Sequence, residues 1–224
     1  MPIRPLLLGH RGARSEKSVT ENTMESFDLA LASGCDGFEF DVRLSGGHCP
    51  VICHDEIVGG LEIVQTSAEK LSLPNLRDVL KRYQASGFLD IELKVAGLES
   101  ITLELLRAYP PTRGYVVSSF LPEVLHTIHD LDATVHLGLI CKTREQLNLW
   151  PKLPIDCLIA HYKLLTRGTI LAIKRAGKKV FVWTVNSRQG MAGFADWKVD
   201  GIISDHPERL VAVIRGQSKS GARK

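Results

Sequence analysis

The sequence has few of the features that mark a secreted or a membrane protein. Its 224 residues include five cysteines, an odd number without a C-x-x-C pair, which argues against a disulfide framework and favours reduced thiols. No apolar run is long enough to cross a bilayer, and the leucine run at 6–8 is too short for the core of a signal peptide. We therefore expect a cytoplasmic protein with no stable membrane insertion.

The net charge is also low. Lysine and arginine number 28 against 25 for aspartate and glutamate, a formal net charge of +3. Lys219, Arg223 and Lys224 account for this excess, so the preceding body is neutral, which argues against a nucleic-acid partner. The apolar content of 44% is that of a globular protein, and we expect one domain over 1–217 with a flexible basic tail over 218–224. The oligomeric state stays open.

Short β-rich runs alternate with longer amphipathic runs along the whole chain. Most of the β-rich runs are continuously apolar, as parallel strands covered on both faces are. Eight strand–helix units leave little room for a second domain and favour an α/β fold, a closed TIM (β/α)8 barrel. No G-x-G-x-x-G motif follows a strand, which weakens the alternative of a doubly wound sheet. The expected strands are Leu6–Gly9, Gly37–Leu44, Phe88–Val95, Tyr115–Ser119, Val135–Cys141, Cys157–His161, Lys179–Val185 and Gly201–Ser204, with a short insertion, which includes the extra run Pro50–Cys53, after the second.

The intervening runs have helical periodicity and helix-end signals. In the first of them, Asn22 and Glu25 form a capping-box pattern and Gly34 is a natural stop, which predicts a helix from Asn22 to Ser33. Asn22 is therefore interpreted as a helix cap. The other helices are expected at Leu76–Gln84, Leu98–Ala108, Pro122–Leu131, Arg144–Leu149, Arg167–Ala176, Arg188–Ala195 and Pro207–Arg215.

Charged residues interrupt the apolar pattern near the ends of two predicted strands. Alternation places Glu39 and Asp41 on one face of the second strand, and Glu92 and Lys94 on one face of the third. If the large apolar residues pack under the helices, these carboxylates point into the barrel, where an unpaired charge is costly. Two interpretations stay open. One is a divalent cation, for which oxygen-only ligands favour Mg²⁺, Mn²⁺ or Ca²⁺. The other is a structural ion-pair cluster with Lys94 and an arginine.

Two histidines also stand where predicted strands end, His10 after the first strand and His54 after the inserted run. In a barrel both would lie at the rim where side chains from different strands converge, and imidazoles are the usual proton-transfer groups at neutral pH. Arg11 offers a fork for a phosphate, and Gly12 lets the backbone turn closely. These residues together fit metal-assisted cleavage of an anionic ester, with phosphate the favoured anion.

The same residues belong to a set of short motifs that run in order along nearly the whole chain. Together they resemble the glycerophosphodiester phosphodiesterase family; one motif alone is weak, but all of them in this order are specific. The resemblance implies a TIM barrel that cleaves a small-molecule glycerophosphodiester into an alcohol and glycerol 3-phosphate. The motifs are His10-Arg11-Gly12, Glu21-Asn22-Thr23, Gly37-Phe38-Glu39-Phe40-Asp41-Val42, His54-Asp55, Ile91-Glu92-Leu93-Lys94, Ser118-Ser119-Phe120, Val182-Trp183-Thr184-Val185-Asn186 and Gly201-Ile202-Ile203-Ser204-Asp205-His206-Pro207.

The resemblance also implies roles for individual residues. Glu39, Asp41 and Glu92 would hold one divalent cation, Mg²⁺ or Ca²⁺, with Mn²⁺ as an alternative, and His10 and His54 would be the catalytic acid and base. In a route proposed for the family, the glycerol 2-hydroxyl attacks phosphorus while one histidine removes its proton and the other protonates the leaving alkoxide. A cyclic phosphate forms and is then hydrolysed.

The remaining implied contacts are with the substrate. Arg11 and Lys94 would bind the phosphate, and Trp183, together with Phe120, would line the pocket beside the glycerol. For Trp183, filling of the barrel core stays open as the alternative. Glu21 would either orient Arg11 or be a solvated carboxylate that suits the dipole of the following helix.

The segment after His54 departs from the family pattern. Many members carry an Arg-Thr-Thr stretch there, and this chain does not, so the resemblance leaves the preferred leaving alcohol open. Three alternative functions also stay open: a lysophospholipase D-type phosphodiesterase, a catalytically silent barrel that binds phosphorylated ligands, and a sugar-phosphate isomerase or aldolase. The last requires a Schiff-base lysine or an enolising base and does not explain two histidines beside three carboxylates.

Overall fold

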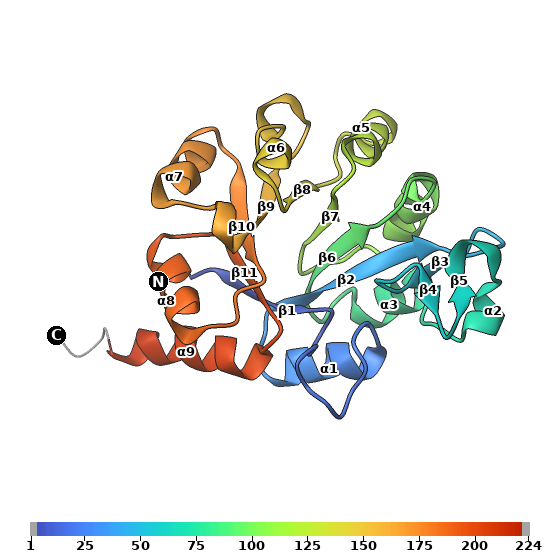
Figure 1. Cartoon of the computed structure of the whole chain (residues 1–224), viewed down its shortest axis with the longest axis horizontal. Helices are drawn as coiled ribbons and strands as arrows, with labels where there is room; N and C mark the ends of the chain where they lie inside the picture. The colour runs from blue at the N-terminus through green and yellow to red at the C-terminus, as the bar shows by residue number, and fades with distance from the viewer. Residues whose placement is uncertain (1–3, 221–224) are drawn as a thin grey trace.

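Eight parallel strands close into a barrel in the structure, a computed structural model that describes residues 4–220. The strands follow chain order around the barrel, and β1 pairs with both β2 and β11, which closes the ring (Figure 1). The predicted TIM barrel is therefore confirmed. Strands β6, β8 and β10 are each two residues shorter than predicted, because those terminal residues lie in the connecting turns. The barrel strands are β1 (Leu6–His10), β2 (Gly37–Leu44), β6 (Phe88–Leu93), β7 (Tyr115–Ser119), β8 (Leu137–Cys141), β9 (Cys157–His161), β10 (Lys179–Trp183) and β11 (Gly201–Ser204).

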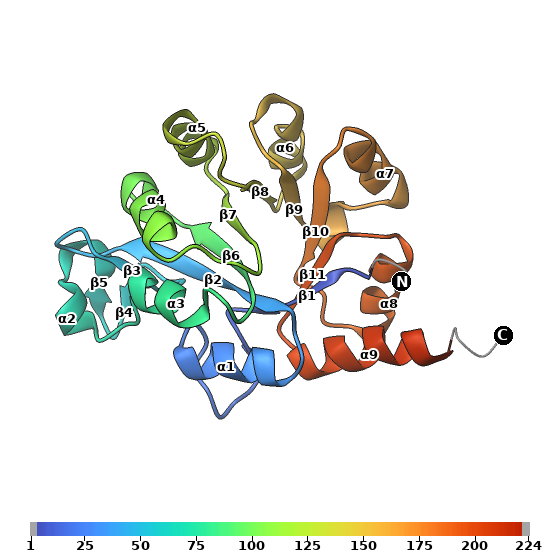
Figure 2. The same ribbon diagram turned by 180° about the vertical axis from the view of Figure 1, so that it is seen from behind.

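Helices ring the barrel in both views of the chain (Figures 1 and 2). The last helix continues to Ser220 and so overlaps the predicted basic tail, while residues 221–224 of that tail lie outside the described residues. No helix within residues 4–220 is long and apolar enough to cross a membrane. The five cysteines are free thiols, and the cytoplasmic location stays a prediction. The α-helices are α1 (Met24–Ala32), α2 (Ala68–Leu71), α3 (Leu76–Tyr83), α4 (Glu99–Ala108), α5 (Pro122–Leu131), α6 (Arg144–Leu147), α7 (Arg167–Arg175), α8 (Arg188–Asp196) and α9 (Pro207–Ser220), and short 3-10 helices lie at Ile63–Gln65, Trp150–Lys152 and Tyr162–Leu164.

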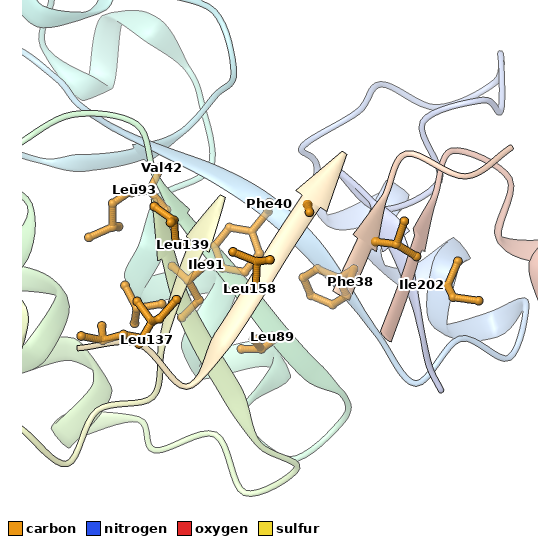
Figure 3. Close-up of a cluster of buried hydrophobic side chains, with 14 of the residues drawn as sticks. Phe38, Phe40, Val42, Leu89, Ile91, Leu93, Leu137, Leu139, Leu158 and Ile202 are labelled. Atoms are coloured by element: carbon orange, nitrogen blue, oxygen red, sulfur yellow. The ribbon is translucent and has the colours of Figure 1, made fainter. Parts of the chain in front are cut away.

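Alternating side chains along the strands form two separate apolar regions. On β2, Phe38, Phe40 and Val42 face outward and pack with other buried residues under the helices (Figure 3). Inside the barrel, a second cluster contains Ile140 and Ile203. Burying one such side chain contributes about 1.5–3 kcal/mol, so a one-residue slip of β2 would be very costly. The alternate residues of β2 therefore point toward the barrel axis.

The predicted insertion after β2 is present, and it contains a hairpin that was not predicted. β3 (Pro50–Ile52) runs antiparallel to β2, and β4 (Ile57–Val58) pairs with β5 (Leu61–Glu62) beside the barrel (Figure 1). Gly59 and Gly60 join β4 to β5 with φ of 56° and 78°, the left-handed conformation that a type I′ hairpin turn requires at both positions. The insertion thus follows the end of β2 that carries the acidic residues.

Candidate active site

A cavity of about 300 Å³ opens at the carboxyl ends of the barrel strands. Of the ten residues singled out in the sequence, eight line this cavity; Asp41 is buried beside it, and Glu21 contacts Arg11. Side chains from the ends of most barrel strands contribute, as is typical of a TIM-barrel active site. The lining residues are His10, Arg11, Glu39, His54, Asp90, Glu92, Lys94, Phe120, Ile140, Lys142, Ile159, Trp183 and Ile203.

Three buried carboxylates form a compact cluster at the floor of this cavity. Glu39, Asp41 and Glu92 each offer one oxygen, and these three oxygens lie within 4.8 Å of one another. The strand register explains the proximity, because β2 and β6 are parallel neighbours with Asp41 directly opposite Glu92. Side-chain alternation then brings Glu39 to the same inward face as Asp41.

Two cationic side chains reach into the carboxylate cluster. Lys94 Nζ lies 2.6 Å from Glu92 Oε1 and 3.3 Å from Asp41 Oδ1. The backbone N–H of Arg11 donates to Glu39 Oε2 at 3.0 Å, and Arg11 Nε lies 3.1 Å from Asp41 Oδ2. With all five groups ionised, the cluster carries a net negative charge, which favours a further cation.

The donor set fits a hard divalent cation. Oε1 of Glu39 is buried and has no hydrogen-bond partner among the residues that the structure describes. An unpartnered buried carboxylate oxygen is unfavourable, and Mg²⁺ and Ca²⁺ take carboxylate oxygens as ligands. Ion pairing with Lys94 and Arg11 is also present, so both interpretations of the sequence pattern describe part of this cluster.

Burial and mutual repulsion shift the pKa values of these carboxyl groups in different directions. Burial, with the charges of Asp41 and Glu92, raises the pKa of Glu39 well above its ordinary value. Burial, followed by repulsion from the charge of Asp41, raises the pKa of Glu92 to about 7. Burial opposes ionisation of Asp41 too, but Lys94 and Arg11 outweigh it and hold the pKa of Asp41 below its ordinary value. Without a cation, protonation therefore falls on the two glutamates.

The metal-free protein is expected to lose stability as pH rises from 5 to 8. The folded pKa of Glu92, about 7, lies above its ordinary 4.5, so its contribution is full below pH 4.5 and is lost as pH rises through 7. Between pH 5 and 8, Glu92 alone should lower the free energy of unfolding by about 2–3 kcal/mol, which corresponds to roughly 5–10 °C in Tm. Thermal unfolding in chelator across this range measures it, and added Mg²⁺ is expected to restore the Tm at pH 8. A metal-free Tm that stays level or rises would contradict the expectation.

Each of the two predicted histidines is held by an aspartate. His10 Nδ1 lies 2.7 Å from Asp205 Oδ1, and His54 Nδ1 lies 2.7 Å from Asp55 Oδ1. Because a carboxylate accepts, Nδ1 carries the proton in each pair and Nε2 is left for a second partner. Nε2 of His10 lies 3.7 Å from Glu39 Oε2, at the carboxylate cluster. His10 is buried, whereas the His54 side chain is 37% exposed at the mouth.

Glu21 lies against Arg11. Arg11 Nη1 donates to Glu21 Oε1 at 2.6 Å, and Arg14 Nε donates to Glu21 Oε2 at 2.6 Å. Burial disfavours the charge of Glu21, but the two arginines outweigh burial and lower its pKa. Of the two interpretations of Glu21, this geometry favours the one in which it orients Arg11. The Arg11 guanidinium therefore contacts two carboxylates, Glu21 and Asp41.

Asn22 is not a helix cap, and that prediction was wrong. Helix α1 begins after Thr23, whose side chain accepts from the Ser26 N–H. Asn22 instead has a left-handed φ of 59°, which turns its buried side chain toward the barrel. Its Nδ2 donates to Asp41 Oδ2 at 2.9 Å, and its Oδ1 accepts from the Asp41 N–H at 3.3 Å. The side chain therefore positions a carboxylate of the cluster, because asparagine tolerates the left-handed backbone that this requires.

One wall of the cavity is aromatic and is formed by Phe120 and Trp183. The rings of Phe120 and Trp183 meet edge to face with their centroids 5.8 Å apart, and Trp183 meets His161 in the same way at 5.4 Å. The Trp183 Nε1–H donates to the Ile159 carbonyl at 3.1 Å, which fixes the indole. Lys94 Nζ lies 5.7 Å from the centroid of the Phe120 ring. Trp183 thus lines the cavity at the end of its strand while it also packs against its neighbours.

Two further carboxylates belong to the site and were not predicted. Asp205 follows β11, and although burial opposes its charge, His10 and Asn186 lower its pKa. Asp90 lies fully buried in the lining, accepts a hydrogen bond from Ser118 Oγ at 2.6 Å, and has its pKa raised by burial to about 7. A signal existed for both: Asp205 stands at the carboxyl end of a barrel strand, and Asp90 is two residues before Glu92 on the same face.

Comparisons with known proteins bear first on the sequence. A sequence model of the glycerophosphoryl diester phosphodiesterase family matches residues 10–107 and 101–209. The glycerophosphodiester phosphodiesterase of Caldanaerobacter subterraneus subsp. tengcongensis is 28% identical over 95% of this chain and 99% of the relative. That of Bacillus altitudinis is 26% identical over 92% of this chain and 97% of the relative.

Solved structures extend the comparison to the fold. An Oleispira antarctica phosphodiesterase, in complex with the product sn-glycerol-3-phosphate, is similar with a TM-score of 0.83 and 26% identity, covering 95% of this chain and 97% of that one. The glycerophosphodiester phosphodiesterase of Thermotoga maritima has a TM-score of 0.81 and 24% identity, covering 93% of this chain and 98% of that one. The chain therefore belongs to the glycerophosphoryl diester phosphodiesterase family and is a phosphoric diester hydrolase.

Proposed function

We propose that the protein hydrolyses glycerophosphodiesters to an alcohol and sn-glycerol 3-phosphate, with His10 and His54 as acid and base. Glu39, Asp41 and Glu92 would hold the divalent cation that the reaction uses. One observation carries the proposal: two histidines, each held by an aspartate, line the same cavity as the carboxylate cluster. The Oleispira antarctica relative, solved with sn-glycerol-3-phosphate, supports the same product here.

The histidines have complementary tasks in this proposal. One removes the proton of the glycerol 2-hydroxyl, whose oxygen forms a bond to phosphorus. The other gives its proton to the alkoxide as the bond between phosphorus and the leaving oxygen breaks. Water then opens the resulting cyclic phosphate, with the proton transfers reversed. Asp205 and Asp55 hold the rings so that each Nε2 is the atom that exchanges the proton.

Binding of the phosphate is assigned to the cationic groups at the cavity floor. Burial opposes the charge of Lys94, but Glu92 and Asp41 outweigh it and raise the pKa of Lys94, which keeps this side chain cationic. Lys94 and Arg11 would contact the phosphate oxygens, and Trp183 with Phe120 would lie beside the glycerol. A bound Mg²⁺ or Ca²⁺, with Mn²⁺ as an alternative, would offset the negative charge that builds on the phosphate during the reaction.

The direct test is release of sn-glycerol 3-phosphate from glycerophosphocholine and glycerophosphoethanolamine. The purified chain would be treated with a chelator and assayed alone and after addition of Mg²⁺, Mn²⁺ or Ca²⁺. We expect no release without a cation and restored release with at least one of the three. If no cation restores release while glycerol 3-phosphate still binds, the barrel is a silent phosphate-binding protein and the proposal is wrong.

A further inference from the structure

A second cavity, of about 450 Å³, lies between the insertion and the end of β6, and its lining is mainly aliphatic. We name it the hairpin groove and define it by Leu44, Ile57, Ile63, Val64 and Val95. Ile57 is 57% exposed and Val64 is 67% exposed, which places both among the most exposed large apolar residues in the described part of the chain. Apolar side chains gathered in a concave surface mark a site for an apolar ligand.

The hairpin groove adjoins the active-site cavity. His54 lines the active-site cavity, and the groove is lined by Glu56, two residues further along the chain. On the other side, Lys94 lines the first cavity and the adjacent Val95 lines the groove. Arg43 also lines the groove, and its Nε donates to the His54 carbonyl at 2.8 Å. A group that passes His54 on the way out of the site therefore meets the groove.

The floor of the hairpin groove is formed by a residue that is packed in an apolar cluster. Ile63 in its floor is buried together with Val51, Cys53 and Leu71, which form a small apolar cluster under the insertion. The Gly46 N–H donates to the Ile63 carbonyl at 3.0 Å and ties this floor to the end of β2. A preformed apolar surface binds without a large cost of ordering.

The lining also limits which leaving alcohol fits. The described residues of the groove include no aromatic ring, the surface on which quaternary ammonium groups are recognised. Its charged residues are Glu56, Glu62 and Arg43, and Arg43 Nη1 lies 3.6 Å from Glu56 Oε1, so one net negative charge remains to disfavour an anionic head group. An uncharged aliphatic chain is the ligand that this surface would bind most tightly, because each fully buried methylene raises the affinity about fourfold.

We propose that the hairpin groove binds an aliphatic chain on the leaving alcohol, so that the substrates are glycerophosphodiesters of alkyl- or acyl-bearing alcohols. This inference rests on the proposed function and deepens it, because it assigns the leaving side of the substrate to His54 and the groove. The chain belongs to the alcohol that departs, and the glycerol that stays on the phosphate occupies the aromatic wall formed by Phe120 and Trp183.

The test is kcat/KM for the ethyl, butyl and hexyl esters of glycerol 3-phosphate, all below the concentration at which they aggregate. A groove that covers one side of the chain should contribute about twofold per methylene, so we expect a roughly 10- to 20-fold rise from ethyl to hexyl. The double variant Ile57→Thr/Val64→Thr keeps the branching at Cβ but replaces the ethyl group of Ile57 and one methyl group of Val64 with hydroxyls. It should reduce the rise to under about threefold and leave the rate on the ethyl ester unchanged.

The control is Leu171→Gln, which removes an exposed apolar side chain from α7 and should keep the full rise. Equal kcat/KM on all three esters would overturn the inference and leave the proposed function intact. So would a rise that persists in the double variant. If the unaltered protein hydrolyses none of the esters or glycerophosphocholine with any of the three cations, the proposed function fails and the inference falls with it.

Discussion

Replacing either His10 or His54 with alanine is expected to lower turnover by roughly 10²- to 10⁴-fold, the usual contribution of a general acid or base. The reason is that each substitution removes the imidazole whose Nε2 exchanges a proton with the substrate, while the cation site and the phosphate contacts remain. The measurement is kcat for release of glycerol 3-phosphate from glycerophosphocholine at saturating Mg²⁺. Near-native turnover in either variant would refute the acid–base assignment.

His126→Ala is the matched control, because His126 is exposed on α5 and does not line the cavity. It should retain full turnover. The double variant His10→Ala/His54→Ala provides a further check. Groups that act together in one step are not additive, so it should be little slower than the slower single variant. A loss equal to the product of the single losses would mean that the two histidines act independently.

Glu39→Gln is expected to lower turnover by roughly 10²- to 10⁴-fold and at the same time to stabilise the metal-free protein at pH 8. Turnover falls because an amide is a poor ligand for a hard cation, whose charge contributes several factors of ten. Stability rises because Glu39 is buried beside Asp41 and Glu92, and burial and these charges raise its pKa. Removing a buried repulsive charge should raise the free energy of unfolding by about 1–3 kcal/mol, which corresponds to roughly 3–10 °C in Tm.

The pH dependence of the Tm of Glu39→Gln distinguishes removal of a repulsive charge from a general change in packing. Because the pKa of Glu39 is raised in the folded protein, the cost of its charge shrinks as pH falls, so the Tm values of the variant and of the unaltered protein should approach each other from pH 8 toward pH 5. Glu104→Gln, an equal change of charge at an exposed position on α4, should leave both turnover and Tm unchanged. A Glu39→Gln protein that keeps its turnover, or that melts lower than the unaltered chain at pH 8, would show that the carboxylate is structural.

The sequence was sufficient for the barrel and for the carboxylate cluster, because both follow from local periodicity. Mainly apolar runs of five to eight residues mark buried parallel strands, and Glu39 and Asp41 interrupt one of these runs two residues apart. Alternation alone then puts both on the inward face once Phe38 and Phe40 face the helices. Neighbouring strands of a barrel bring Glu92 beside them without further information.

Other parts of the site depend on contacts that no local pattern records. The turn at Asn22 looked like a helix start because asparagine caps helices, and only the left-handed backbone reveals its bonds to Asp41. The hairpin after His54 was missed because its strands are two residues each, too short for periodicity, although Gly59 and Gly60 between apolar pairs are a turn signal. Predicting the role of Asp205 would have required knowing which strand end faces His10.

The contact between His10 and Asp205 determines when, during synthesis of the chain, the site can be completed. His10 and Asp205 are 195 residues apart along the chain, and they meet only because β11 completes the barrel against β1. A nascent chain emerging from the ribosome can pair β2 with β6 and gather its acidic cluster early, since those residues lie between 39 and 92. It cannot orient His10 until β11 and the residue after it have been synthesised. A chain that ends before Asp205 therefore lacks the carboxylate that holds His10.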